Sequence, residues 1–190
     1  MTAVVVAILS MTVLGLAIAL SLDPRLRGPM LLGLAFLYGS GSVFLVLLVL
    51  SILHVRWTIV IITIVLVAGL LVCLVARWRR NTQQQSNPAT QQLRFHWLDI
   101  PTLISMIGFA LFATAAPLWE WDFWAIWGLK ARQFLDAGGI DWRFLESPWN
   151  SFAHPDYPLL VPLNFDFVAL LNGGWSDRYL GLLSVAWAVA

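Results

Sequence analysis

The sequence predicts an all-α, polytopic membrane protein: a transmembrane helical bundle of five full spans and a truncated sixth, with an extracytoplasmic loop that contains an interfacial helix. Two observations carry this prediction. Hydrophobic residues make up 60% of the chain and charged residues 11%, and the mean hydropathy of +0.82 is far above that of soluble domains. In addition, several apolar runs approach the roughly 20 residues that cross a bilayer core. The net charge of +1 gives no reason to expect nucleic acid as a partner.

The first unit, residues 1–80, is predicted to contain three spans. Its apolar runs lie at residues 3–22, 29–53 and 57–76, and none of them contains an acidic residue. The second run holds small residues at which helices can approach closely, namely Gly33, Gly39, Ser40, Gly41 and Ser42. A polar, low-complexity stretch without aromatic residues follows at 81–92, which predicts a disordered cytoplasmic linker that extends to residue 97.

The second unit, residues 98–190, is predicted to begin a larger membrane core. Its first span is expected at residues 100–119, with Asp99 as the N-cap and Pro101 in the first turn. Residues in this unit carry most of the acidic groups of the chain. A site with ionisable groups is therefore expected here rather than in the first unit.

Two shorter apolar segments complete the second unit. The run at residues 158–172 is predicted as a fifth span, and because it contains Asn164 and Asp166 it needs protein neighbours more than lipid. Asp166 is a candidate functional residue, although it can equally serve as a hydrogen-bonding group within the bundle. The last run, residues 180–190, is long enough for about half of a crossing at about 1.5 Å per residue. We therefore expect the chain to be a fragment or a truncated gene product.

The distribution of basic residues predicts the orientation in the membrane, because cytoplasmic loops are enriched in Lys and Arg. If Met1 lies outside, the predicted cytoplasmic cations are Arg25, Arg27, Arg77, Arg79, Arg80, Arg94 and Arg178, and the outer ones are Arg56, Lys130, Arg132 and Arg143. This bias places residues 120–157, which we call the Trp-rich block, on the extracytoplasmic side of a cell membrane.

The Trp-rich block begins with a pair of acids, Glu120 and Asp122. Two carboxylates at this spacing can raise one another's pKa, bind a divalent cation, or supply a base that the partner orients. A solvated helix end is the structural alternative. The chemistry of the pair is thus left open by the residues alone.

An amphipathic helix is predicted next, at residues 123–137, with Gly138 and Gly139 as its stop signal. Its composition is typical of a helix that lies in the membrane interface. Lys130 and Arg132 on this helix are either snorkelling anchors or ligands for a phosphate-bearing substrate. The residues alone favour anchoring.

A second polar cluster, His154, Asp156 and Tyr157, lies between prolines at the end of the block. The prolines restrict the backbone, which suits a site and equally suits a tight return into the membrane. A divalent metal held by this cluster and the acidic pair is conceivable, but the spacing matches no recognised metal motif.

The order of these features resembles the first luminal loop of the GT-C superfamily of membrane glycosyltransferases. The matching features are the acidic pair, the helix WAIWGLKARQF and the motif HPDYPLL, within about residues 100–171. The most similar branch is the glycosyltransferase family 39-like one of bacterial protein mannosyltransferases and the lipid A aminoarabinose transferase. The chain departs from that pattern in its three additional N-terminal spans and in HPDYP, where HPPL is more familiar.

The resemblance implies transfer of a sugar from a polyprenyl-phosphate carrier to an extracytoplasmic acceptor in a bacterial inner membrane. It also implies roles for individual residues: a catalytic acid or base at Asp122 or, second, at Glu120; cations near the carrier phosphate at Lys130 and Arg132; and groups that shape the site at His154, Asp156 and Tyr157. It identifies neither the sugar, the acceptor nor a need for a divalent cation. A non-catalytic membrane subunit or a transporter segment is the alternative.

Overall fold

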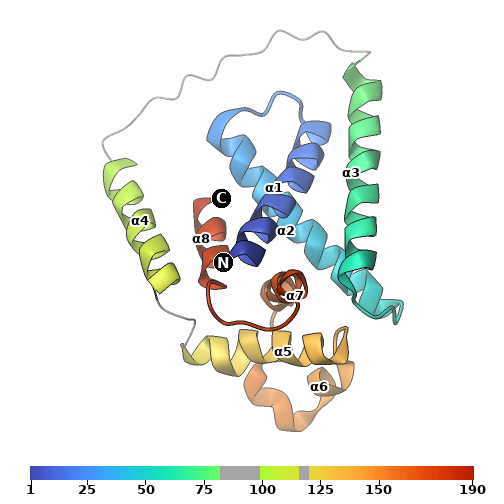
Figure 1. The fold of residues 1–190 in the computed structure, drawn as a ribbon, viewed down its shortest axis with the longest axis vertical. Coiled ribbons are helices and arrows are strands. Elements are labelled where there is room, and N and C mark those ends of the chain that lie inside the picture. The colour runs from blue at the N-terminus through green and yellow to red at the C-terminus, as the bar shows by residue number, and fades with distance from the viewer. Residues whose placement is uncertain (82–98, 116–119) are drawn as a thin grey trace.

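The computed structural model describes residues 1–81, 99–115 and 120–190, and within these ranges the chain is helical with no β-strand. The elements in order are α1 (Thr2–Leu22), α2 (Gly28–Ile52), α3 (Ile59–Asn81), α4 (Asp99–Ala115), η1 (Phe123–Trp127), α5 (Gly128–Ala137), α6 (Trp142–Glu146), η2 (Pro148–Ala153), α7 (Leu160–Asn172) and α8 (Gly181–Val189) (Figure 1). The predicted all-α class is therefore confirmed for the described residues. The predicted linker at 82–97 and the end of the predicted fourth span at 116–119 lie outside them.

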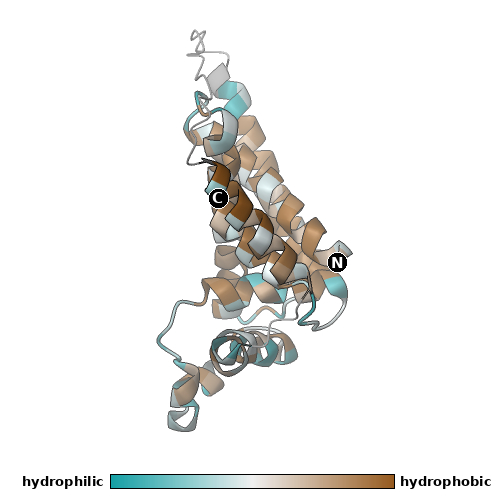
Figure 2. Ribbon diagram, turned by 90° about the vertical axis from the view of Figure 1, so that its left-hand side faces the viewer, coloured by the Kyte–Doolittle hydropathy of each residue, from teal (hydrophilic) through white to brown (hydrophobic). Residues whose placement is uncertain are grey.

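Three of these helices are long and apolar enough to cross a membrane. They are α1, α2 and the part of α3 from Ile59 to Arg79, with 21, 25 and 21 residues respectively. Figure 2 shows hydrophobic residues along these helices and more hydrophilic residues toward the two ends of the molecule. The membrane character and the first three predicted spans are thus supported, whereas α7, with 13 residues, is shorter than a full span. Helix α4 has 17 described residues and ends where the undescribed residues 116–119 begin.

Helices α1 and α2 cross in close backbone contact, and two glycines make this contact possible. A Cβ atom at Gly15 would lie 1.7 Å from the carbonyl oxygen of Ala35, and one at Gly39 would lie 1.8 Å from that of Met11. The role expected of Gly39 is confirmed, and Gly15 is its partner on α1. Gly41, by contrast, has no atom within 4 Å of a Cβ position, so its small size serves no contact among the described residues.

Helix α7 is enclosed between α1 and α2 on one side and α5 on the other (Figure 1), and every residue from Pro162 to Ala169 is buried. Figure 1 shows α7 nearly along its axis, while α3 runs vertically, so α7 is strongly inclined to the predicted spans. Its 13 residues give a length of about 20 Å, against about 30 Å for a bilayer core. The apolar run that predicted a fifth span therefore forms a short, protein-enclosed helix.

A polar contact fixes α7 against α2 and α8. The amide of Asn164 donates to the carbonyl oxygens of Leu160 at 2.8 Å and Ser40 at 3.4 Å, and the Ser40 hydroxyl donates to Asn164 Oδ1 at 3.2 Å. The Trp187 indole N–H in turn donates to the Ser40 hydroxyl at 3.0 Å. Since all polar atoms of Asn164 are used, this buried amide has a structural role.

Helix α5 lies across the lower end of the bundle in Figure 1, roughly perpendicular to α3. Together with the π-helical η1 it covers the predicted range 123–137. It ends at Gly138, whose φ of 70° is the left-handed conformation typical of a glycine C-cap. The helix at residues 123–137 and its stop signal are therefore confirmed.

Candidate functional site

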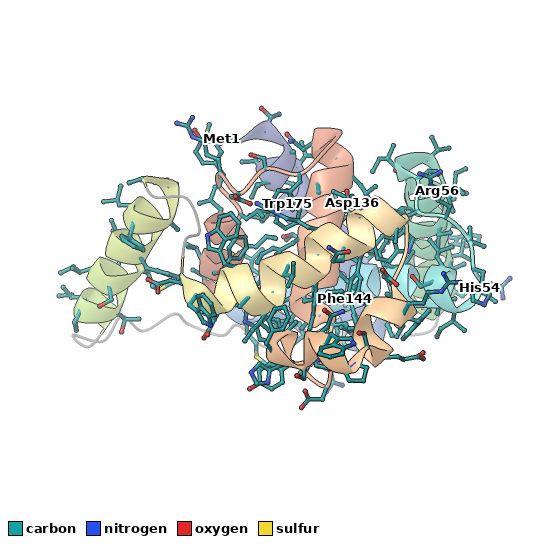
Figure 3. The ribbon with its side chains drawn as sticks, turned by 90° about the horizontal axis from the view of Figure 1, so that it is seen from below. Met1, His54, Arg56, Asp136, Phe144 and Trp175 are labelled. Atoms are coloured by element: carbon teal, nitrogen blue, oxygen red, sulfur yellow. The ribbon has the colours of Figure 1, made fainter. Side chains whose placement is uncertain are left out.

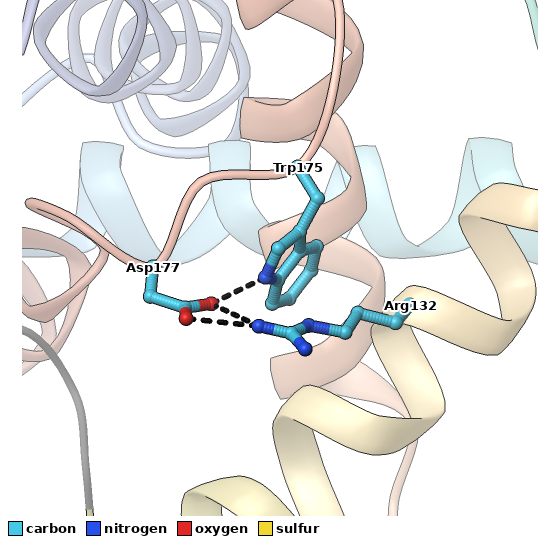
Figure 4. Close-up of polar contacts among 3 residues, drawn as sticks. All are labelled: Arg132, Trp175 and Asp177. Atoms are coloured by element: carbon cyan, nitrogen blue, oxygen red, sulfur yellow. Dashed lines mark hydrogen bonds and ion pairs between the residues drawn. The ribbon is translucent and has the colours of Figure 1, made fainter.

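Arg132 on α5 is held by the carboxylate of Asp177 and the indole ring of Trp175 (Figure 4), and by a second indole ring, that of Trp124. Its Nη2 donates to both carboxylate oxygens of Asp177 at 2.8 Å, and Trp175 Nε1 donates to Asp177 Oδ1. The guanidinium also lies over the rings of Trp124, at 4.7 Å from the centroid, and Trp175, at 5.1 Å. This arrangement partly neutralises Arg132 and fixes its plane, as ion pairing and cation–π contacts do.

The Arg132–Asp177 ion pair corrects one element of the predicted topology. Arg132 belongs to the Trp-rich block, whereas Arg178, next to Asp177, was expected on the opposite side of the membrane. A contact of 2.8 Å between the two segments is incompatible with a bilayer between them. The segment after α7 therefore lies beside the Trp-rich block, and the prediction that a bilayer separates these two segments does not fit this contact.

Lys130 is fully buried, although the residues predicted it as an interfacial anchor or a phosphate ligand. Its Nζ donates to the backbone carbonyl oxygen of His154 and lies over the rings of Trp127, at 5.5 Å, and Tyr157, at 5.7 Å. Burial lowers the pKa of Lys130, and the negative charge of Asp156 opposes this effect. Lys130 thus ties α5 to the loop that follows η2, and it is covered rather than open to a ligand.

The predicted residues His154, Asp156 and Tyr157 are all exposed in that loop. The ring of His154 stacks on that of Tyr157, with centroids 4.5 Å apart and 19° between the planes. The backbone of His154 has a φ of 48°, a left-handed conformation that costs a non-glycine residue free energy and needs support from its surroundings. The structure therefore holds the His154 ring in a defined place at the surface.

The acidic pair lies at the start of the helix formed by η1 and α5. Glu120 and Asp122 are both exposed, and Asp122 occupies the N-cap position of η1 without a capping hydrogen bond from its side chain. Neither residue forms an ion pair within the described part of the chain. Their carboxylates are consequently open to water and to an incoming hydroxyl group, as a general base requires.

The structure does not bring the acidic pair and the His154 cluster together as metal ligands. Among residues 1–81, 99–115 and 120–190, no group of three His, Cys, Asp or Glu side chains could hold a metal ion. The divalent-cation site that the residues left open is therefore not formed by these side chains.

Reasoning from the sequence missed one polar residue of importance, Asp177, and left the role of another, Asp166, open. Asp177 received no role because the loop 173–180 was placed on the cytoplasmic side, although its WSD triplet, like the Trp-rich block, combines an indole with an acid. Asp166 was named only as a candidate. It is 0% exposed, and neither of its carboxylate oxygens has a hydrogen-bond partner among the described residues.

Comparison with known proteins adds no relationship: no protein-family model matches the chain, and no curated protein or solved structure is similar to it.

Proposed function

We propose that this chain belongs to a membrane glycosyltransferase that transfers a sugar from a polyprenyl-phosphate carrier to an acceptor on the side of the Trp-rich block. The observation that carries the proposal is the placement of the acidic pair. Glu120 and Asp122 are exposed at the start of a helix that lies across the end of the membrane-spanning bundle. A carboxylate at this level can meet a lipid-linked sugar whose tail stays in the membrane.

Asp122 is the proposed general base, which removes the proton of the acceptor hydroxyl as that oxygen attacks the sugar. Glu120, two residues earlier, is the second choice. The exposed His154, Asp156 and Tyr157 would contribute to binding of the acceptor or carrier. The proposal includes more membrane crossings than the three supported helices, with α4 and α8 as parts of further spans and the loop side as extracytoplasmic.

An apolar groove supports a lipid-linked substrate. It has a volume of about 580 Å³ and runs between α1, α2 and α8, with Ile8, Phe36 and Ala186 in its lining. Two of its three helices, α1 and α2, are long and apolar enough to span a membrane, so the groove would adjoin lipid hydrocarbon if they do. A polyprenyl or acyl chain has the apolar character to occupy it.

The cations fit the proposal less well than the acids. Lys130 is buried, so of these two cations Arg132 alone could approach a carrier phosphate. The side chain of Arg132 is only partly exposed, and its charge is already paired with that of Asp177. This observation favours the alternative that the chain is a non-catalytic membrane subunit or transporter segment in which the block serves as an anchor. In that case no exposed carboxylate of the block should influence any sugar transfer.

The test is replacement of Asp122 by Asn, followed by measurement of sugar transfer from polyprenyl-phosphate-linked donors in membranes that contain matched amounts of protein. We expect a loss of about 100-fold to 10,000-fold, as for removal of a general base. Glu146→Gln is the matched control, because Glu146 is also an exposed acid of the block. Full activity of both Asp122→Asn and Glu120→Gln would exclude the acidic pair and favour the non-catalytic alternative.

A further inference from the structure

A second polar site lies at the far end of α5 from the acidic pair. A pocket of about 420 Å³ opens there between the α2–α3 loop and the C-terminal end of α5. Figure 3 shows His54 and Arg56 of this loop beside that end of α5. The volume is within the usual range for sites that bind small ligands.

The lining of this pocket is basic. His54 and Arg56 contribute a ring with N–H donors and a guanidinium, and no carboxylate is part of the lining. Two acids adjoin lining residues in sequence, Asp136 before Ala137 and Asp141 before Trp142, and neither is part of the lining. The carboxylate of Asp141 accepts a hydrogen bond of 3.1 Å from the backbone N–H of Phe144. Within the described residues neither His54 nor Arg56 forms an ion pair.

Basic residues near helix ends often serve as caps for the last carbonyl groups, but these groups have other donors here. The carbonyl oxygen of Leu50, at the end of α2, accepts from the backbone N–H of Val55 at 2.8 Å. That of Gly138, at the end of α5, accepts from the N–H of Trp57 at 2.7 Å. The two basic side chains are therefore not needed to satisfy these helix ends.

Gly138 gives Arg56 its place at the pocket. A Cβ atom on Gly138 would lie 2.8 Å from Arg56 Cγ and 2.9 Å from its Nε, so the side chain of Arg56 lies directly against bare backbone. This contact restricts the rotamers of Arg56 before any ligand is bound. Binding of an anion therefore costs less side-chain entropy than it would at a freely rotating arginine. The charge is thus held at the pocket in the absence of a ligand.

The position of the pocket relative to the candidate spans indicates which class of anion it would bind. It lies where α2 ends and α3 begins, and both helices are candidate spans, so it is at the level of lipid headgroups. We propose that this pocket binds a phosphate group, the chemistry that an anionic lipid headgroup shares with soluble phosphate. Arg56 is the principal ligand, and His54 and the Trp142 indole are additional donors.

This site is independent of the proposed transferase site. The 5 residues of η1 and the 10 of α5 separate it from Asp122, a distance of about 22 Å at about 1.5 Å per residue. A phosphate bound at Arg56 is therefore too far away to be the leaving group of a reaction at Asp122. Loss of one site should leave the other unchanged.

The experiment measures ligand affinity of the purified chain in a neutral detergent. Phosphatidylglycerol, inorganic phosphate and, as a zwitterionic control, phosphatidylcholine are titrated separately, with the thermal midpoint of unfolding and native mass spectrometry as readouts. We expect Arg56→Gln to weaken binding of the anionic ligand by about tenfold to a hundredfold and Arg56→Lys to weaken it less. Arg143→Gln, which removes an exposed charge of the Trp-rich block outside the pocket lining, should have no effect.

The three ligands identify the source of the phosphate. Binding of both phosphatidylglycerol and inorganic phosphate with the same dependence on Arg56 indicates that the pocket recognises phosphate itself. Binding of phosphatidylglycerol alone, with that dependence, indicates a lipid headgroup. Equal affinities of wild type and Arg56→Gln, or an equal loss in Arg143→Gln, would overturn the proposal in favour of general attraction between charges.

Discussion

Arg132 on α5 and Asp177 in the loop between α7 and α8 are 45 residues apart in sequence and joined by two contacts of 2.8 Å. Phe123 and Trp175 reinforce the junction, with stacked rings 6.4 Å apart. The pair therefore fixes the loop after α7 to the helix that covers the end of the bundle. We therefore expect this loop and the Trp-rich block to lie on the same side of the membrane.

The first prediction concerns this topology. In a Cys73→Ser background, single cysteines introduced by Ser151→Cys and Ser176→Cys should react alike with an impermeant thiol reagent in intact cells, because both exposed residues lie at the same end of the bundle. Arg25→Cys, in the loop at the other end of α1, serves as the control and should show the opposite accessibility. Labelling of Ser151→Cys and Ser176→Cys from opposite sides would show that α7 crosses the membrane.

The second prediction concerns the crossing of α1 and α2. Gly39→Ala places a methyl group 1.8 Å from the Met11 carbonyl oxygen, so the helices must move apart, at a cost of about 1–3 kcal/mol of unfolding free energy. Gly41→Ala is the matched control, since no atom lies within 4 Å of its Cβ position. There the better helix propensity of Ala should raise stability by up to about 1 kcal/mol. Thermal unfolding in detergent measures both, and equal effects would contradict the close crossing.

The features that sequence reasoning predicted correctly are determined locally. The three long apolar runs, the amphipathic pattern of residues 123–137 and the glycine stop signal at Gly138 each depend on residues close together in the chain. Hydropathy and turn chemistry act over this range. The same holds for Gly39, whose small size within a span already indicated a close helix contact.

The features that were missed depend on contacts between distant residues. A 13-residue apolar run looks the same whether it crosses a membrane or lies enclosed in protein, and the Asn164–Ser40 bonds that fix α7 span 124 residues. Likewise, Lys130 has the sequence context of an interfacial anchor. Only the fold reveals that the His154 carbonyl and the ring of Tyr157 cover it.

The third prediction uses the pKa of Lys130, the sole lysine of the chain. Burial lowers this pKa below the ordinary value of 10.5, so the folded state holds the proton less tightly than the unfolded state. Between the lowered pKa and 10.5 unfolding takes up a proton, and stability rises with pH. The contribution is fully present above 10.5 and is lost as the pH falls through the folded-state pKa.

The measurement compares wild type with Lys130→Met across this alkaline range, by the midpoint of denaturant unfolding in detergent. Methionine keeps the apolar stem and removes the charge. The stability of wild type relative to the variant should increase as the pH rises toward 10.5. Arg143→Met provides the control, because an arginine keeps its charge over this range and its difference should be flat. A difference for Lys130 that stays flat or falls with pH would contradict its burial as a charged group.

The last prediction concerns Asp166, whose carboxyl group is buried without the hydrogen bonds that a buried polar group normally has. It is 0% exposed, and within the described residues its carboxylate oxygens have no hydrogen-bond partner. A buried polar group without a partner costs about 1–3 kcal/mol, so Asp166→Leu, which fills a similar volume with apolar atoms, should raise the unfolding free energy by about that amount.

Asp177→Leu is the contrasting variant. It leaves Arg132 without its carboxylate and should lower stability by about 1 kcal/mol, because that pair is partly exposed. A stabilised Asp166→Leu would show that the native carboxyl is kept at a cost in stability, as groups retained for function are. A destabilised Asp166→Leu would instead reveal a partner for this carboxyl beyond the described contacts.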